Sequence, residues 1–350
     1  MNKISVASYM GSGSSAVTDL LSEYEMVCCP QENFEYIFLH CPNGVFDLED
    51  KLLRGNNALR RDEAIRSFRK AMAELYGNGR WWFAGYETKL TPSFMVLVDD
   101  FIESITECTF EGYWYQQEKI SRVQHVVNKC KQMAGVPRFD LFAERLVVAY
   151  PEPNDFYRQA SNFINKALEA KVRDSENDGK VLLIDQLFLP HNLHRLDYYF
   201  PDDSLKVVSV SRDPRDVYIL NKYRWHPQGC PIPIPEEPEA FCLYYSKMRK
   251  VEQPYTGKQV LPLQFEDLVF HYEETTAKIE DFCAGLLGAH IDSRKRFDPN
   301  VSIANIGVFS SDEKFEEEAA YIAKRLPQYL YSEMDQLIKV KPHTAIDLSF

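Results

Sequence analysis

The sequence lacks the marks of several common functional classes. No apolar stretch approaches the roughly 20 residues that a membrane-spanning helix needs, and the first predicted strand starts so early that no signal peptide fits before it. The net charge is −12, so the chain has no basic excess of the kind that tracks nucleic-acid phosphates. These absences predict a cytoplasmic protein with no membrane span and no nucleic-acid partner.

The cysteines and histidines show no metal-binding pattern. The chain has 8 cysteines, none in a C-x-x-C spacing, and no histidine lies at zinc-ligand intervals from them. A long chain without a secretory signal favours reduced thiols. His191 and His194 are spaced i, i+3, but no third ligand stands nearby. We therefore expect no metal.

Apolar runs alternate with helical patterns along much of the chain. Strands are predicted at 3–9, 180–185, 205–211 and 259–265, with helices at 14–24, 155–171 and 312–338. Such alternation is typical of a parallel sheet covered by helices on both faces. We predict one α/β domain over 1–350, with three layers, a central parallel sheet and a helical insertion at 45–150. The aromatic side chains of that insertion, which either fill a core or stack on sugar rings, are expected to fill a core (Trp81, Trp82, Tyr86, Tyr113, Trp114 and Tyr115).

A turn rich in glycine and serine joins the first strand to the first helix. It contains Gly11, Ser12, Gly13, Ser14 and Ser15, and Ala16 follows in the helix. Glycines let the backbone approach a ligand closely, and serines add hydroxyl donors. A helix N-terminus adds backbone N–H groups and a positive dipole end, so this turn suits a phosphate or a sulfate.

A second anion-binding pattern follows the strand at 205–211. Arg212 ends that strand in an Arg-Asp-Pro-Arg-Asp run, and Pro214 stands where the next helix begins. An arginine at this edge can point its guanidinium into the crevice that the glycine turn faces. Together the two patterns predict a ligand with anions at both ends. Arg215 is more easily explained as a helix-surface ion pair.

These two motifs, followed by Gln264-Phe-Glu-Asp-Leu268, resemble the sulfotransferase superfamily. The resemblance implies a P-loop-like fold and 3′-phosphoadenosine 5′-phosphosulfate as co-substrate, with no metal. The turn from Gly11 to Ala16 would hold the 5′-phosphosulfate, and Arg212 would hold the 3′-phosphate. Ser302-Ile-Ala-Asn305 resembles the loop that folds over the 3′ side of the nucleotide, which makes Asn305 a further candidate.

Two positions depart from the family pattern. Most members have lysine or arginine where Gly11 stands, and a serine where Leu220 stands. Lys89 or Arg54 could supply the missing charge, and the sequence does not choose between them. Asn221 or Tyr218 could replace the serine.

The acceptor hydroxyl needs a base, and the family suggests where to find it. Carbohydrate sulfotransferases use a glutamate just after the first helix, which corresponds here to Glu32, with Glu35 as second choice and Asp185 as third. Small-molecule sulfotransferases use a Lys-x-His pair that is absent at 184–187. The resemblance therefore implies a bacterial carbohydrate-type enzyme that sulfates a carbohydrate or glycolipid.

Two other functions stay open. Residues 181–185 imitate the Walker B strand of a P-loop kinase or NTPase, but the turn lacks the lysine of G-x-x-x-x-G-K-(S/T). The missing lysine and serine also leave room for a non-catalytic polysaccharide-binding protein that retains the fold.

Overall fold

The chain forms two compact units. The computed structural model describes residues 1–9, 11–30, 34–173, 180–230 and 234–340. Unit 1 comprises 1–37 and 172–350, and unit 2 comprises 38–171. The predicted insertion at 45–150 falls within unit 2. A single domain over 1–350 stays a prediction.

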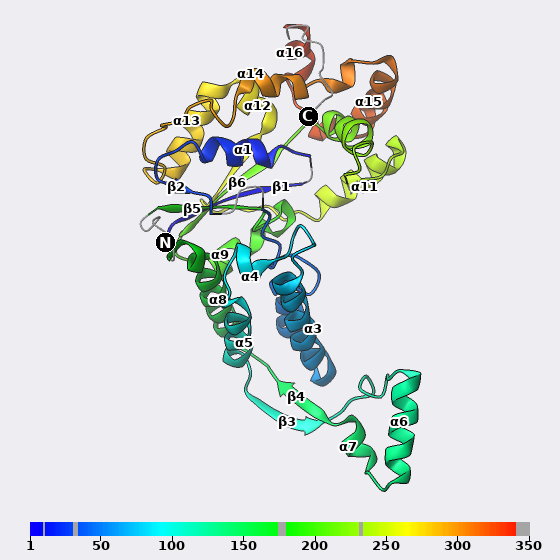
Figure 1. Cartoon of the computed structure of the whole chain (residues 1–350). Coiled ribbons are helices and arrows are strands. Elements are labelled where there is room, and N and C mark those ends of the chain that lie inside the picture. Colours follow the sequence, from blue (N-terminus) through cyan, green and yellow to red (C-terminus); the bar gives the residue numbers. More distant parts are fainter. Residues whose placement is uncertain (10, 31–33, 174–179, 231–233, 341–350) are drawn as a thin grey trace. The chain divides into compact units, whose positions relative to one another are not determined.

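Unit 1 contains a parallel sheet, which has five strands among the described residues (Figure 1). Their order is β2-β5-β1-β6-β7, and every pair is parallel. The strands are β1 (Lys3–Ser8), β2 (Val27–Cys28), β5 (Val181–Asp185), β6 (Leu205–Ser211) and β7 (Val260–Gln264).

Helices of the same unit flank this sheet. Figure 1 shows α1, α12 and α13 on one face and α9 on the other. The predicted α/β class with a central parallel sheet is confirmed. The α-helices of unit 1 are α1 (Ser14–Leu21), α9 (Leu196–Tyr199), α10 (Pro214–Ile219), α11 (Pro238–Lys250), α12 (Phe265–Phe270), α13 (Tyr272–Cys283), α14 (Pro299–Ser302), α15 (Glu313–Arg325) and α16 (Met334–Val340). Short 3-10 and π-helical segments are η2 (Pro190–Arg195), η3 (Leu220–Trp225), η4 (Ile303–Asn305), η5 (Val308–Ser310) and η6 (Pro327–Tyr329).

The central position of β1 in the sheet explains its burial. All six of its residues are buried, and Ile4 and Val6 belong to the same core cluster as Val208 and Val210 of β6. The strand is not a continuous apolar run, because the polar residues Lys3, Ser5 and Ser8 are buried beside Ile4, Val6 and Ala7. Because the strands are parallel, their carboxyl ends meet at one edge of the sheet, where ligands of open α/β folds bind.

Unit 2 is mainly helical and has an aromatic core. The rings of Phe101 and Phe163 stack at 5.3 Å, and the rings of Phe68 and Phe94 lie within 6.4 Å of Phe163. The helices are α2 (Val45–Glu49), η1 (Asp50–Arg54), α3 (Ala58–Gly77), α4 (Tyr86–Lys89), α5 (Phe94–Ser104), α6 (Arg122–Met133), α7 (Arg138–Phe142) and α8 (Pro153–Arg173).

Two features of unit 2 differ from the predictions. An antiparallel ribbon of β3 (Cys108–Gly112) and β4 (Glu144–Val148) was not predicted; half of its residues are exposed and only Gly112 and Leu146 are buried, so no regular alternation marks it. Tyr86 is buried in the core as expected, but Trp81 and Trp82 are 42% and 50% exposed. Core filling is therefore wrong for these two tryptophans and also for Tyr115, which is 68% exposed.

Two further features concern the helices and the cysteines. Within the described ranges, no helix combines the length and the apolar character needed to cross a bilayer. All 8 cysteines are free thiols.

Candidate functional site

The predicted anion turn lies between β1 and α1 and needs both of its glycines. Gly11 and Gly13 have φ of 84° and 93°, a region that other residues avoid. A Cβ on Gly13 would lie 2.5 Å from Cδ2 of Phe265. A Cβ on Gly11 would lie 2.8 Å from Nδ2 of Asn221 and 2.9 Å from Cζ3 of Trp225. These contacts explain why no lysine or arginine stands at position 11.

The N-terminus of α1 carries no side-chain cap. Gly13 is the N-cap residue and has no side chain, so no N-cap side chain accepts a hydrogen bond from the first-turn amides of α1. Ser12 is buried, and its backbone N–H donates to the carbonyl of Tyr9 at 3.1 Å. Ser15 and Ala16 lie in the first turn, as expected. An uncapped helix N-terminus behind a glycine turn is suited to an anion.

Gln186, which the sequence did not single out, fixes this turn to the sheet. Its Oε1 accepts the backbone N–H of Ser8 at 3.1 Å, and its Nε2 donates to the hydroxyls of Ser8 at 2.9 Å and Ser14 at 3.2 Å. Gln186 directly follows β5, so one side chain joins two strand ends to the start of α1. Its only sequence signal is a polar residue directly after a buried strand.

Arg212 lies against the same turn. It follows β6, is only 4% exposed, and donates from Nη1 to the carbonyl of Gly11 at 3.3 Å and from Nη2 to the carbonyl of Asn305. Its guanidinium covers the ring of Phe265 at 4.6 Å. Its Nε is buried with no partner among the described residues. The structure thus brings Arg212, the glycine turn and Asn305 together.

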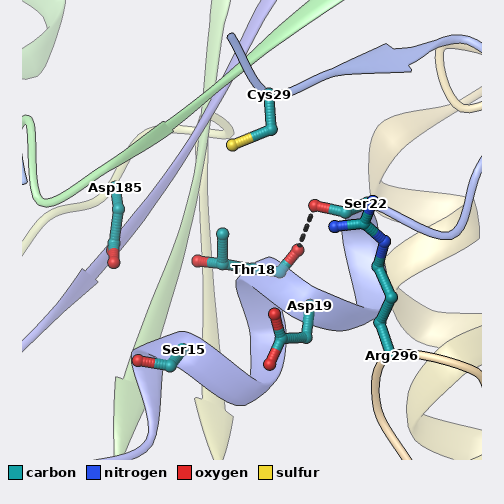
Figure 2. Close-up of a pocket in the computed structure, with 7 residues that line it drawn as sticks. All are labelled: Ser15, Thr18, Asp19, Ser22, Cys29, Asp185 and Arg296. Atoms are coloured by element: carbon teal, nitrogen blue, oxygen red, sulfur yellow. Dashed lines mark hydrogen bonds between the residues drawn. The ribbon is translucent and has the colours of Figure 1, made fainter. Parts of the chain in front are cut away.

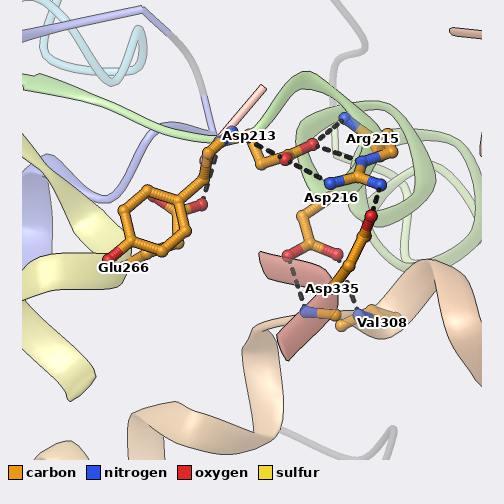
Figure 3. Close-up of polar contacts among 8 residues, drawn as sticks. Asp213, Arg215, Asp216, Glu266, Val308 and Asp335 are labelled. Carbon is orange, nitrogen blue, oxygen red and sulfur yellow. Dashed lines mark hydrogen bonds and ion pairs between the residues drawn. The ribbon is translucent and has the colours of Figure 1, made fainter. Parts of the chain in front are cut away.

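The rest of the Arg-Asp-Pro-Arg-Asp run holds the surrounding loops (Figure 3). Asp213 accepts from Nε and Nη2 of Arg215 at 2.9 and 2.8 Å, and from the backbone N–H of Tyr331 at 3.0 Å. Arg215 is therefore ion-paired as expected, although the pair is buried rather than on the surface. Asp216 accepts the backbone N–H groups of Gly307 and Val308 at 2.7 and 2.8 Å. The run anchors the loop that places Asn305 beside Arg212.

Glu266 is a buried carboxyl in the same region. Its Oε1 accepts the backbone N–H of Asp213 at 2.9 Å, and its Oε2 has no partner among the described residues. Burial raises the pKa of Glu266 to about 8, and burial also raises the pKa of Asp216 to about 6. At neutral pH Glu266 is therefore largely uncharged, which limits its competition with a ligand for Arg212.

Asn221 and Tyr218 are the two residues that the sequence offers in place of the missing serine. Leu220 is 2% exposed and belongs to the hydrophobic core. Asn221 lies beside Gly11, and its Nδ2 donates to the carbonyl of Val217 at 2.7 Å. The hydroxyl of Tyr218 instead donates to the carbonyl of Glu236. Asn221 thus adjoins the glycine turn, and the hydroxyl of Tyr218 is engaged at the carbonyl of Glu236.

Two carboxyl groups meet at the end of β5. Residue 35 pairs with residue 185 as an isolated parallel bridge, and the backbone N–H of Tyr36 donates to the carbonyl of Asp185 at 3.0 Å. Burial, and then the charge of Glu35, raise the pKa of Asp185 to about 8. Burial also raises the pKa of Glu35. Glu32, the first choice as base, lies outside the described residues.

Asp185 lines a small pocket of about 40 Å³ beside the anion turn (Figure 2). Ser15 lines it from α1, and Arg296 lines it from the loop after α13. Glu23 holds that loop by accepting the backbone N–H groups of Arg296 and Phe297 at 2.7 and 3.0 Å. The pocket residues are Ser15, Thr18, Asp19, Ser22, Cys29, Asp185 and Arg296. Arg296 is thus a basic residue near the turn that the sequence did not indicate.

The two cations proposed from the sequence are engaged within unit 2. Nζ of Lys89 donates to the carbonyl of Trp82 at 2.7 Å, and burial lowers the pKa of this lysine. Arg54 lies 3.6 Å from a carboxylate oxygen of Glu49 and 3.4 Å from one of Asp50.

The chain resembles known proteins in structure and not in sequence. No known protein family matches the sequence, and no curated protein matches it. The chain is similar to the crystal structure of a sulfotransferase from Mycobacterium tuberculosis H37Rv. The two share 11% identity, the match covers 91% of this chain and 76% of the other, and the TM-score is 0.34.

Proposed function

We propose that this chain is a sulfotransferase that moves a sulfuryl group from 3′-phosphoadenosine 5′-phosphosulfate to a hydroxyl of a carbohydrate or glycolipid. The observation that carries the proposal is the contact between Arg212 and the carbonyl of Gly11. It unites two anion-binding elements that are about 200 residues apart in sequence. A donor with a charged group at each end fits such a pair of elements.

The 5′ end of the donor has a suitable site at the turn. The amides of Gly13 to Ala16 precede or belong to the first turn of α1, where no side chain caps them. Both glycines fix the shape of the turn, because a Cβ on Gly13 would collide with Phe265 and a Cβ on Gly11 with Asn221 and Trp225. In this proposal these amides hold the 5′-phosphosulfate.

The 3′ end of the donor fits the surroundings of Arg212. The buried Nε of Arg212 is a donor without a partner among the described residues, and a phosphate oxygen would satisfy it. Asn221 lies beside Gly11, whose carbonyl accepts from Nη1 of Arg212. Nη2 of Arg212 donates to the carbonyl of Asn305. We assign these two asparagines to the same 3′-phosphate site.

The reaction requires one proton to leave the acceptor. An acceptor oxygen forms a bond to sulfur as the sulfur–oxygen bond to the 5′-phosphate breaks, and the hydroxyl proton passes to a base. We keep Glu32 in that role. Glu35 is the second choice, because burial raises its pKa toward neutral pH, where a general base is most effective. Asp185 is the third choice, since a pKa of about 8 leaves it mostly protonated at neutral pH. Protonated Asp185 also avoids repelling the anionic donor.

The acceptor class rests on the sequence. The chain lacks the Lys-x-His pair of small-molecule sulfotransferases and has a glutamate in the position that carbohydrate enzymes use. A bacterial source and a cytoplasmic location belong to the same proposal.

Isothermal titration with two nucleotides tests the donor site. Wild type should bind adenosine 3′,5′-bisphosphate more tightly than adenosine 5′-monophosphate, because only the former reaches Arg212. Arg212→Ala should weaken bisphosphate binding by about 1.5–3 kcal/mol, the range for a charge-assisted hydrogen bond. Monophosphate affinity should change little, which controls for a distorted turn. Equal losses for both nucleotides would refute the assignment of Arg212, and preference for ATP with Mg²⁺ would favour the NTPase alternative.

A further inference from the structure

Helix α6 turns its apolar side toward solvent. Val123, Val126, Cys130 and Met133 recur at intervals of three and four residues, so they form one stripe along the helix. Val123, Val126 and Met133 are 75%, 61% and 84% exposed, and Cys130 is exposed too. Asn128, on the other side of the helix, is only 5% exposed.

This orientation is the reverse of that of an ordinary surface helix. A surface helix normally packs its apolar stripe on the core and presents its polar side to water. Here α6 lies between β3 and β4 in the chain, beyond the ribbon that they form (Figure 1). Val127, next to the stripe, is also exposed. A continuous apolar patch of this kind indicates an interaction surface, unlike scattered exposed side chains.

Positive charges border the stripe. At 3.6 residues per turn, Arg122 and Lys129 flank it on one side and Lys131 on the other. The helix sequence contains no aspartate or glutamate. Residues 113–143 carry five basic and two acidic side chains, in a chain whose net charge is −12.

We propose that α6 docks on the surface of a lipid bilayer with anionic headgroups. In that position the stripe enters the boundary between headgroups and acyl chains, and the flanking cations meet the lipid phosphates. Lysine and arginine suit this arrangement because their apolar stems lie along the hydrocarbon while their charges stay in water. A basic amphipathic helix is a recognised pattern for such a surface.

The same charges disfavour a second copy of this chain as the occupant. Pairing α6 with α6 of another copy would bring Arg122, Lys129 and Lys131 of both helices together, with no acidic partner on either helix. The proposal goes beyond sulfuryl transfer and rests on α6 alone, so it stands or falls separately from the proposed function.

Cosedimentation of the full chain with vesicles tests this docking. Vesicles of phosphatidylcholine mixed with phosphatidylglycerol should bind the chain, and vesicles of phosphatidylcholine alone should bind it far less. Val126→Asp should reduce binding at least about tenfold, because it places a charge in the middle of the stripe. Val96→Asp is the matched control, since Val96 lies on α5 and has the same 61% exposure. It should bind like wild type.

Salt and oligomeric state complete the test. Added salt and Lys129→Gln should weaken binding, whereas Lys70→Gln, an exposed lysine on α3, should not. Circular dichroism of each variant checks that α6 still folds. Absence of binding to the anionic vesicles, or equal binding by Val126→Asp, would overturn the proposal. So would a dimer in solution that Val126→Asp dissociates, because the stripe would then be covered by a second copy.

Discussion

Substitution of Gly13 by alanine tests the geometry of the anion turn. Two costs add at this position. A non-glycine residue at the observed φ of 93° costs about 1–2 kcal/mol. The new Cβ would also lie 2.5 Å from the ring of Phe265, and relieving that overlap in a packed core costs about 1–3 kcal/mol. The free energy of unfolding of unit 1 should therefore fall by roughly 2–5 kcal/mol.

Gly285→Ala provides the matched control. Gly285 belongs to the same unit and has φ of 79°, but a Cβ there would meet nothing within 4 Å. It should lose only the conformational part, about 1–2 kcal/mol. Urea unfolding of wild type and both variants measures the difference. Equal losses for the two alanine variants would refute the close contact between Gly13 and Phe265.

Three further predictions address the neighbouring groups. Gln186→Leu leaves the buried backbone N–H of Ser8 without its acceptor and should lower the free energy of unfolding by about 1–3 kcal/mol. The control Gln228→Leu, at an exposed position, should lower it hardly at all. Similar values for both variants would contradict the role of Gln186 in fixing the turn. The pKa of Asp185 is raised from 3.8 to about 8, so between these two pH values the folded state holds a proton that the unfolded state has lost. The stability that protonated Asp185 contributes is therefore lost as the pH rises from about 4 to about 8. The stability of Asp185→Asn relative to wild type should accordingly grow between about pH 4 and about pH 8, and a pH-independent difference in urea unfolding would refute the raised pKa. Glu32→Gln should lower the rate of sulfuryl transfer by about 10²–10⁴-fold with little change in donor affinity, and near wild-type turnover would transfer the role of base to Glu35 or Asp185.

The strands were predictable because their sequences leave little choice. The predicted runs 180–185 and 205–211 correspond to β5 and β6 within one residue, since both are buried apolar segments bounded by polar turns. Strand β2 has only two residues, too short to produce a pattern. The ribbon of β3 and β4 could not be predicted for a different reason: half of its residues are exposed and only two are buried, so no periodic burial marks it.

The site was predictable only where a single residue type is required. Glycines in a turn and an arginine at a strand end each predict an anion site from a few neighbouring residues. In the structure the glycines have positive φ, and the arginine contacts their turn. Gln186 and Arg296 act through contacts with residues far away in the sequence, so no local spacing reveals them. The absence of lysine at position 11 becomes intelligible only with Asn221 and Trp225 in place beside Gly11.

A crystal structure of the chain with adenosine 3′,5′-bisphosphate tests the central claim most directly. The account predicts the 5′-phosphate within hydrogen-bond reach of the amides of Gly13 to Ala16, and the 3′-phosphate against Nε of Arg212, with Asn221 and Asn305 nearby. A nucleotide bound with its phosphates away from the glycine turn, or with the 3′-phosphate in solvent, would contradict it.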